Sequence, residues 1–303
     1  MDWFAASRTA ALIASTVEQG LLFGCLGLGV LISFRFFRFP DLTAEGSYPL
    51  GGAVAASLIV SGVHPAAATL AALLAGAGAG AATAAIHARL RINNIVAGII
   101  VMTALYSLNL RIMGRANIPL LGFPTVFTLS ADAATGGAAA SVQRMDVNVA
   151  LAAALLALLV LGLDRFLRTD LGLAVRATGE NEPMIRGLGV NTTGTKILGL
   201  AVSNALVAVS GALIAQNHGF ADIGMGVGVL VMGAAGVLIG EALVGEGSVA
   251  RWMAAAIAGV LVYRLLVAVA LQIGLRPTDL RLITAVLVLA VLALPRLRLQ
   301  AGT

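Results

Sequence analysis

The sequence predicts an all-α protein, a polytopic bundle of transmembrane helices in a single domain over residues 1–303. Two observations predict this fold. Hydrophobic residues make up 59% of the chain and charged residues only 11%, whereas soluble domains carry roughly 25% charged residues. The apolar residues also form long uncharged runs, and a helix needs about 20 apolar residues to cross a bilayer. Lipid is therefore the solvent for most of the chain.

The uncharged runs predict eight to nine spans. Residues 46–88 hold no charge and are long enough for two spans, which a turn signal from Gly62 to Pro65 divides. The second and seventh segments are short and rich in glycine, so we expect either to be a broken or re-entrant helix, and eight full spans is the alternative count. The nine segments are 10–34, 46–61, 66–88, 92–112, 147–164, 197–217, 224–242, 252–273 and 279–295.

Basic residues set the orientation, because cytoplasmic loops carry an excess of Lys and Arg. When the loop at 165–196 is placed in the cytoplasm, alternation puts twelve of the 19 basic residues inside and six outside, with Arg264 within a span. This distribution predicts a cytoplasmic C-terminus and an N-terminus on the far side of the membrane.

Glycines recur at four-residue spacing, which lets helices approach closely in lipid. We interpret these pairs as packing positions. They are Gly20/Gly24, Gly76/Gly80, Gly224/Gly228 and Gly236/Gly240.

Several kinds of chemistry have no motif in this sequence. Lys196, the one lysine, follows Thr195, so the phosphate-binding Gly-Lys loop is missing and the chain does not hydrolyse ATP by that route. The three histidines are widely separated, and no cysteine cluster accompanies them, which argues against a metal site. The basic residues are scattered singly, unlike those of nucleic-acid-binding proteins. We therefore predict no catalytic residues and no cofactor in this chain.

The loop at 165–196 carries the most informative pattern. Apolar residues recur there at helical spacing with glycines between them, and Glu182-Pro183 suits the first turn of a helix. We predict one or two short amphipathic helices parallel to the membrane. Two interpretations are open at this point, an ordinary solvated loop and a docking element for a cytoplasmic partner.

This loop resembles a known family. The run Arg176 to Glu182 (Arg-Ala-Thr-Gly-Glu-Asn-Glu), with Gly187 to Asn191 (Gly-Leu-Gly-Val-Asn) after it, is similar to the cytoplasmic signature of ABC importer permeases of the branched-chain amino acid/ribose transport group. Two further blocks, 39–47 and 97–117, resemble the subgroup associated with tryptophan/tyrosine-type binding proteins. The likeness covers residues 12–295 or so.

The resemblance implies the permease subunit of an ATP-driven importer in a bacterial inner membrane. Two copies would form a pore, separate ABC ATP-binding subunits would hold ATP and Mg on the cytoplasmic side, and a periplasmic solute-binding protein would deliver the substrate. The implied cargo is a small solute, an aromatic or branched-chain amino acid, with sugars and nucleosides as alternatives. From other classes, an ion-coupled secondary transporter and a structural membrane scaffold are the rivals.

We predict two sets of functional residues. Polar groups at membrane depth are costly and usually face a cavity or a partner, so the first set borders the translocation path: Glu18, Asp41, Thr43, Glu45, Ser47, Met102 and Asn109. By resemblance, the second set couples to the ATPase, with Ile185, Leu188 and Val190 as its apolar contact: Arg176, Gly179, Glu180, Asn181, Ile185, Arg186, Leu188, Gly189, Val190 and Asn191. Glu18 with Gln19 is equally well read as an interhelical hydrogen-bond pair. Arg264 lies within a span, and we expect it to snorkel or to pair with Glu241 rather than to contact the substrate.

Overall fold

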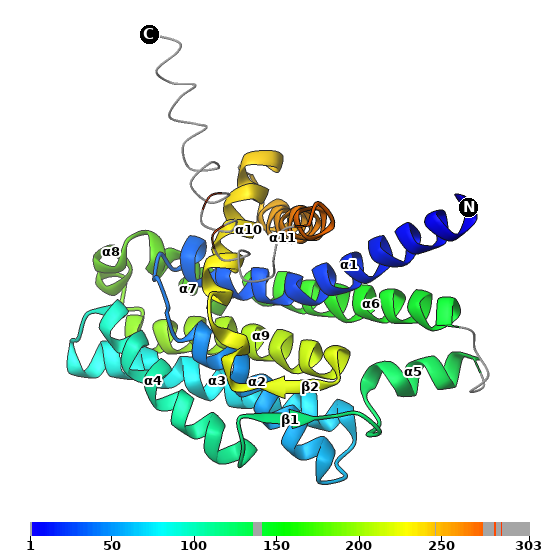
Figure 1. The fold of residues 1–303 in the computed structure, drawn as a ribbon. Helices are drawn as coiled ribbons and strands as arrows, with labels where there is room; N and C mark the ends of the chain where they lie inside the picture. The colour runs from blue at the N-terminus through cyan, green and yellow to red at the C-terminus, as the bar shows by residue number, and fades with distance from the viewer. Residues whose placement is uncertain (1, 136–140, 246, 275–281, 283–285, 287–303) are drawn as a thin grey trace.

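The computed structural model describes residues 2–135, 141–245, 247–274, 282 and 286, which form a bundle of helices (Figure 1). The first half contains α1 (Asp2–Leu31), the π-helical turn η1 (Ile32–Phe36), α2 (Ala44–Val60), α3 (Pro65–Leu90), α4 (Asn94–Met113), β1 (Asn117–Pro119) and α5 (Val126–Thr135). The second half contains α6 (Ser141–Leu167), α7 (Asp170–Glu180), α8 (Glu182–Gly187), α9 (Thr192–His218), β2 (Phe220–Asp222), η2 (Ile223–Gly226), α10 (Val229–Val244) and α11 (Val249–Gln272). The predicted all-α membrane bundle is confirmed.

Seven helices in the described part of the chain are long and apolar enough to cross a membrane. The predicted segment 46–61 corresponds to α2, whose 17 residues fall short of that length and whose side chains are mostly buried by neighbouring helices. The segment 224–242 was expected to be short or broken, and a break is present, because Val227 and Gly228 separate η2 from α10. Together the two elements make a span of 22 residues, Ile223–Val244. The predicted segment 279–295 lies outside the described residues except for 282 and 286.

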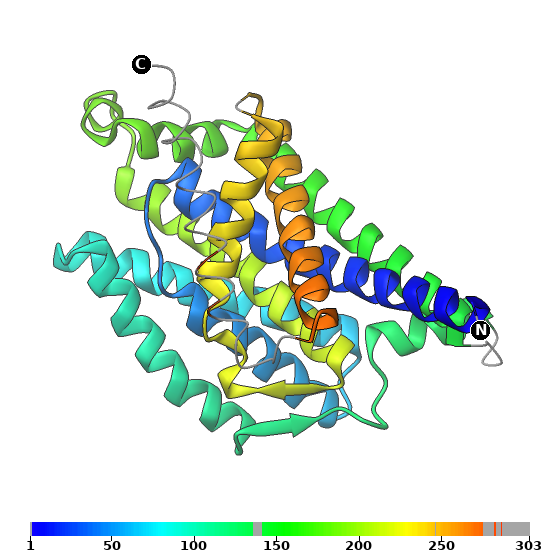
Figure 2. The same cartoon turned by 45° about the horizontal axis from the view of Figure 1, so that its top comes forward.

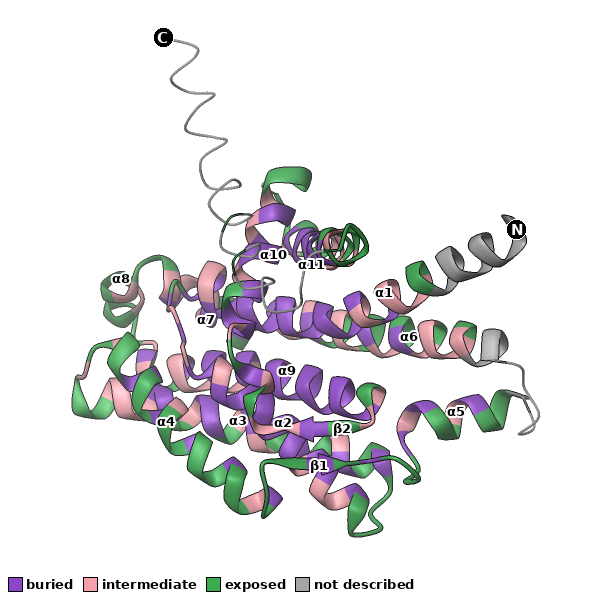
Figure 3. Ribbon diagram, viewed as in Figure 1, coloured by how far each residue is buried: buried purple, intermediate pink, exposed green. Residues whose placement is uncertain are grey.

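The helix α9 forms the centre of the bundle. Every residue from Ser203 to Gln216 is buried, and α1, α2 and α3 pack around this stretch, which is drawn as a continuous purple helix in Figure 3. By contrast, much of α4 is exposed in the same view. Elements that pack on α9 are therefore held by protein on several sides, whereas α4 presents an apolar face to lipid or to another chain.

Three of the four predicted glycine pairs lie in helix contacts, where a Cβ atom would come within 3.1 Å of a neighbouring helix. These are Gly20/Gly24 against α11 and α6, Gly76/Gly80 against α9, and Gly236/Gly240 against α11. The interpretation was wrong for Gly224/Gly228. Gly228 has a φ of +82° with open space around it, so it turns the chain from η2 into α10.

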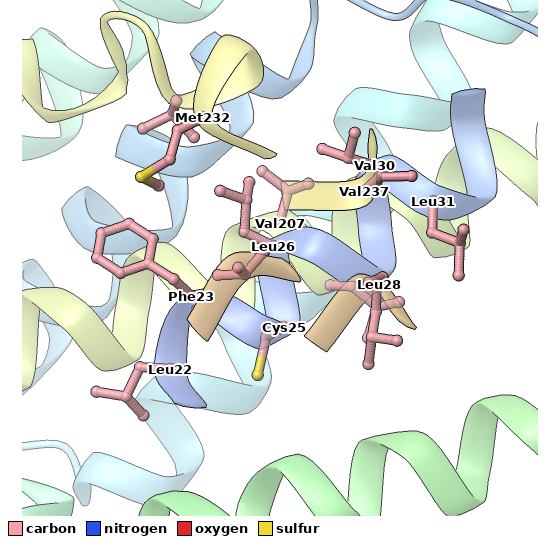
Figure 4. Packing of buried hydrophobic residues seen from close by; sticks show 14 of the residues in the cluster. Leu22, Phe23, Cys25, Leu26, Leu28, Val30, Leu31, Val207, Met232 and Val237 are labelled. Atoms are coloured by element: carbon pink, nitrogen blue, oxygen red, sulfur yellow. The ribbon is translucent and has the colours of Figure 1, made fainter. Parts of the chain in front are cut away.

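Aliphatic side chains of α1 build the largest hydrophobic core. Figure 4 shows Leu26 and Val30 of α1 gathered with Val207 of α9 and Val237 of α10. Leu26 is completely buried, and the close approach of α10 is possible because Gly233 faces Val30 and Leu26. This core fixes α1 and α10 onto α9 through van der Waals packing, which is the main source of helix association in lipid.

The two ends of α9 carry different structures. The short helices α7 and α8 precede its start, and at its other end β2 pairs antiparallel with β1, with Ile118 opposite Ala221 (Figures 1 and 2). The backbone N–H of Leu120 also donates to the carbonyl of Gly219 at 2.7 Å. By the predicted orientation, α7 and α8 are cytoplasmic, and β1, β2 and α5 lie on the far side.

Candidate functional site

The predicted short helices in the 165–196 loop are present as α7 and α8, and polar caps define their boundaries. Thr169, Asn181 and Asn191 precede α7, α8 and α9, and the side-chain oxygen of each accepts a backbone N–H of the helix that follows, at 3.2, 3.1 and 3.1 Å. Such caps satisfy N–H groups that a helix start leaves unpaired. Two predicted coupling residues, Asn181 and Asn191, therefore set where α8 and α9 begin.

Close backbone packing anchors α7 to the bundle. A Cβ atom on Gly179 would lie 2.0 Å from the carbonyl oxygen of Phe36, so only glycine lets α7 touch the end of the first span. Val175 is completely buried, and the hydroxyl oxygens of Thr178 and Thr195 lie 3.0 Å apart. Gly179, also a predicted coupling residue, thus joins α7 to η1.

Ion pairs attach α8 to the first turn of α9. The Glu182 carboxylate lies 2.7 Å from Arg186 Nη2 and 2.7 Å from Lys196 Nζ, and Arg186 Nη2 donates to Thr192 Oγ1 at 3.1 Å. Burial raises the pKa of Glu182, but the hydrogen bond and charge of Lys196, together with Thr192 and Arg186, lower that pKa below its ordinary value. The carboxylate is therefore ionised at neutral pH and holds α8 in one orientation.

The outer face of α8 is apolar and exposed. None of its residues is buried; Met184 is 59% exposed and Leu188, just after the helix, is 69% exposed. Ile185 and Val190, which were expected to share the apolar contact with Leu188, are half-buried. Met184 was not among the predicted coupling residues, although its four-residue spacing from Leu188 places both side chains on one helical face. Gly189 ends this element with a φ of +86°.

The remaining predicted coupling residues belong to α7. Glu180 is exposed and pairs with Arg38, whose Nη2 lies 2.9 Å from its carboxylate. Arg176 is half-buried and lines a cavity of about 440 Å³ between α7 and the turn that joins α10 to α11. Together, α7 and α8 present a polar rim and an apolar tip on one end of the molecule.

Three predicted translocation residues lie in a buried hydrogen-bond network between the start of α2 and α9. Asp41 Oδ1 accepts the backbone N–H of Thr43 at 2.9 Å, and its Oδ2 accepts from Asn204 Nδ2 at 2.6 Å. Ser47 Oγ donates to Asn204 Oδ1 at 2.7 Å, and the hydroxyl oxygens of Thr43 and Thr83 lie 2.7 Å apart. All five side chains are buried, so within one chain this network ties α2 and α3 to α9.

Three further residues of that set lie in or near α4 and α10. Asn109 is buried and donates to the carbonyl of Gly46 at 3.2 Å, and Met102 is half-buried on the same helix. Glu45 is half-buried, and its Oε1 accepts the backbone N–H of Gly228 at 3.2 Å. Their role in a translocation path stays a prediction.

The charged groups within the first and last described spans are paired across helices. Glu18 accepts a hydrogen bond from the side chain of Asn217, and Gln19 accepts one from Arg264. The expected pairing of Arg264 with Glu241 was wrong, because Glu241 lies 3.9 Å from Arg35, and Arg264 instead bonds to Gln19 and lies over the ring of Phe23. Within the described residues, no group of three His, Cys, Asp or Glu side chains could share a metal ion.

Comparison with known proteins identifies the family. The family model described as "Branched-chain amino acid transport system / permease component" matches residues 12–293. The chain belongs to this family. It is 39% identical to the "Tyrosine transport system permease protein" of Clostridioides difficile (strain R20291) over 289 residues, which cover 95% of this chain and 92% of the relative. It is also 34% identical to "Uncharacterized protein RP368" of Rickettsia prowazekii (strain Madrid E), over 91% of this chain and 94% of that protein.

Family membership and the apolar helices agree. The protein is a multi-pass membrane protein and the permease component of an amino acid transport system. No solved structure matches the chain. The sequence block that first suggested this family, Arg176 to Asn191, contains the second half of α7, the whole of α8 and the cap of α9.

Proposed function

We propose that this permease is the membrane subunit of an ATP-driven importer and carries an aromatic amino acid, with tyrosine as the first candidate. Two copies would form the pore in a bacterial inner membrane, and a solute-binding protein would deliver the substrate on the side of β1 and β2. The tyrosine assignment is supported by the name of the relative that is 39% identical over 95% of this chain.

The observation that carries the proposal is the apolar tip of α8. Met184 and Leu188 are more than half exposed at an end of the molecule where ion pairs and caps fix the backbone. A solvent-exposed apolar pair on a rigid, polar-rimmed element is typical of a protein contact. Since the chain has no phosphate-binding loop of its own, an ATP-binding subunit is the partner that would supply energy through this contact.

The contact can be tested by charging the tip of α8. The permease is co-expressed with its candidate ATP-binding subunit, and Met184→Asp with Leu188→Asp should reduce the amount of co-purified ATPase at least tenfold, because two carboxylates would be desolvated in the interface. Leu121→Asp is the matched control, because Leu121 is 85% exposed and lies near β1, on the far side. Normal ATPase recovery with the α8 double variant would refute this docking site.

The energy source and cargo need a separate measurement. Uptake of radiolabelled tyrosine into proteoliposomes that contain the complete complex and the binding protein should require ATP and continue when ion gradients are collapsed. Leucine, ribose and a nucleoside serve as competing substrates. Uptake that follows an ion gradient and ignores ATP would instead support the secondary-transporter alternative.

A further inference from the structure

A polar cavity of about 440 Å³ lies between α7, the end of η1 and the turn that joins α10 to α11. Its lining includes Arg35 and Phe36 of η1, Arg176 and Glu180 of α7, and Trp252 of α11. The exposed apolar tip of α8 is not part of this lining, so the cavity is separate from the proposed ATPase contact made by Met184 and Leu188.

Two guanidinium groups from different helices face this cavity. Arg35 stacks over the Trp252 ring, with its Cζ atom 4.2 Å from the ring centroid. The Nε of Arg176 is buried and has no hydrogen-bond partner among the described residues. Glu180, the one acidic group in the lining, is engaged by Arg38 at 2.9 Å, and Arg35 lies 3.9 Å from the Glu241 carboxylate. The unsatisfied donor of Arg176, which faces a cavity whose one acidic group is already paired, indicates a site for an anion.

The cavity lies at the depth where the hydrocarbon core meets the lipid headgroups. The first membrane span ends at Phe36, the span Ile223–Val244 ends just before the turn, and the last described span begins at Val249. Three spans thus end or begin at the cavity. Tryptophan is enriched at this depth in membrane proteins, and Trp252 occupies it here.

An exposed apolar side chain belongs to the same cavity. Leu173, which lines the cavity, is 56% exposed. A free phosphate ion would leave Leu173 uncovered, whereas the acyl chains of a lipid would cover it. An anionic group that is attached to hydrocarbon therefore fits both Arg176 and Leu173.

We propose that the cavity binds the phosphodiester headgroup of an anionic phospholipid from the cytoplasmic leaflet. The guanidinium group of Arg176 contacts its phosphate oxygens, for which the planar donor fork of arginine is well suited, and Arg35, paired with Glu241, lies at the edge of the same cavity. Basic pockets between helices on the cytoplasmic side are suited to such headgroups. The bound lipid bridges α7 to the α10–α11 turn, so it stabilises the position of α7 against the transmembrane bundle.

Trp252 provides a reporter for the test, because the chain has two tryptophans and Trp3→Phe leaves only this one. The purified full-length Trp3→Phe protein is placed in nanodiscs that contain phosphatidylglycerol or phosphatidylcholine with brominated acyl chains. Brominated phosphatidylglycerol should quench Trp252 more strongly at equal lipid fraction. Adding Arg176→Gln should reduce the preference for phosphatidylglycerol about tenfold, the loss expected for a charge-assisted hydrogen bond.

Arg89→Gln is the matched control, because Arg89 is an exposed arginine in the last turn of α3 and does not line the cavity. It should leave the lipid preference unchanged. Equal quenching by the two lipids in the Trp3→Phe parent overturns the proposal, even if Arg176→Gln fails to fold. If the preference for phosphatidylglycerol survives Arg176→Gln, it comes from the bulk bilayer and the lipid assignment is overturned. If millimolar inorganic phosphate removes the preference, the site binds a free anion and the lipid assignment is overturned as well.

Discussion

The close contact between α3 and α9 allows a prediction about stability, because two glycines on α3 have different surroundings. A Cβ atom on Gly80 would lie 2.0 Å from the carbonyl oxygen of Leu200 and 2.9 Å from the Asn204 side chain. A Cβ atom on Gly78, two residues earlier, would meet no atom within 4 Å. The substitutions Gly80→Ala and Gly78→Ala therefore add the same methyl group to the same helix, once inside the contact and once outside it.

The expected energies follow from this geometry. Ordinary van der Waals contact begins at 3.4 Å, so the methyl group added by Gly80→Ala would force the backbones of α3 and α9 more than 1 Å apart along this contact. Overpacking of a tight interface typically costs about 1–3 kcal/mol, and the obstacle here is backbone rather than a side chain that could rotate away. We expect Gly80→Ala to reduce the free energy of unfolding by about 3 kcal/mol. Gly78→Ala should raise it by up to about 1 kcal/mol through helix propensity.

The assay is unfolding in mixed detergent micelles with increasing dodecyl sulfate, followed by circular dichroism. Gly76→Ala extends the series, because a Cβ atom there would lie 2.4 Å from both Ala208 Cβ and the Asn204 carbonyl oxygen. Its stability should fall with that of the Gly80→Ala protein. Equal stability of the Gly78→Ala and Gly80→Ala proteins would refute the close approach of the two backbones.

Three further predictions concern charges and the buried thiol. Because the folded state lowers the pKa of Glu182, its ion pair with Lys196 stabilises the protein above the ordinary carboxyl value of 4.5 and stops doing so as the pH falls through the lower folded-state value. Glu182→Gln should thus lower the melting temperature at neutral pH, and this difference should vanish in acid; a difference that persists would contradict the pairing. Cys25 is 1% exposed, so a maleimide should label it only after denaturation, and rapid labelling of the native protein would show that the α1 core is wrong. Gln19→Leu should destabilise the protein by about 1–2 kcal/mol by stranding the Arg264 guanidinium, and adding Arg264→Met should recover part of the loss, whereas additive losses would exclude the pair.

The sequence predicted the features that depend on local composition. Uncharged runs identified the spans, and the residues around Glu182 and Pro183 identified the short helices α7 and α8. Composition does not distinguish lipid from protein as the surroundings of an apolar helix, so the burial of α2 by other helices did not follow from its sequence. Gly228 was misjudged for a similar reason, since four-residue spacing alone does not separate a packing glycine from one with positive φ.

Contacts between distant segments were beyond the reach of sequence patterns. Asp41 and Asn204 are 163 residues apart, and their hydrogen bond depends on how α2 and α9 are rotated toward each other. The partner of Arg264 was equally hard to predict. Gln19 and Glu241 are both polar residues at membrane depth, and only the packing of α1 on α11 shows that Gln19 is the partner. Polar residues in spans can thus be picked out from sequence, but their partners follow from helix rotation.

The position of α9 explains how a force on α8 could reach the opposite face. α9 is one uninterrupted helix of 27 residues, about 40 Å long at 1.5 Å per residue. At its start, Lys196 and Thr192 are bonded to α8, and at its end the carbonyl of Gly219 is bonded to the strand pair β1–β2. Because close-packed interiors resist gradual deformation, α8 and the far-side strands should move as parts of one rigid body when α9 shifts against its neighbours. A cross-link between α9 and α3 should therefore block transport while leaving ATPase docking intact, and transport that survives the cross-link would show that α9 does not carry the movement.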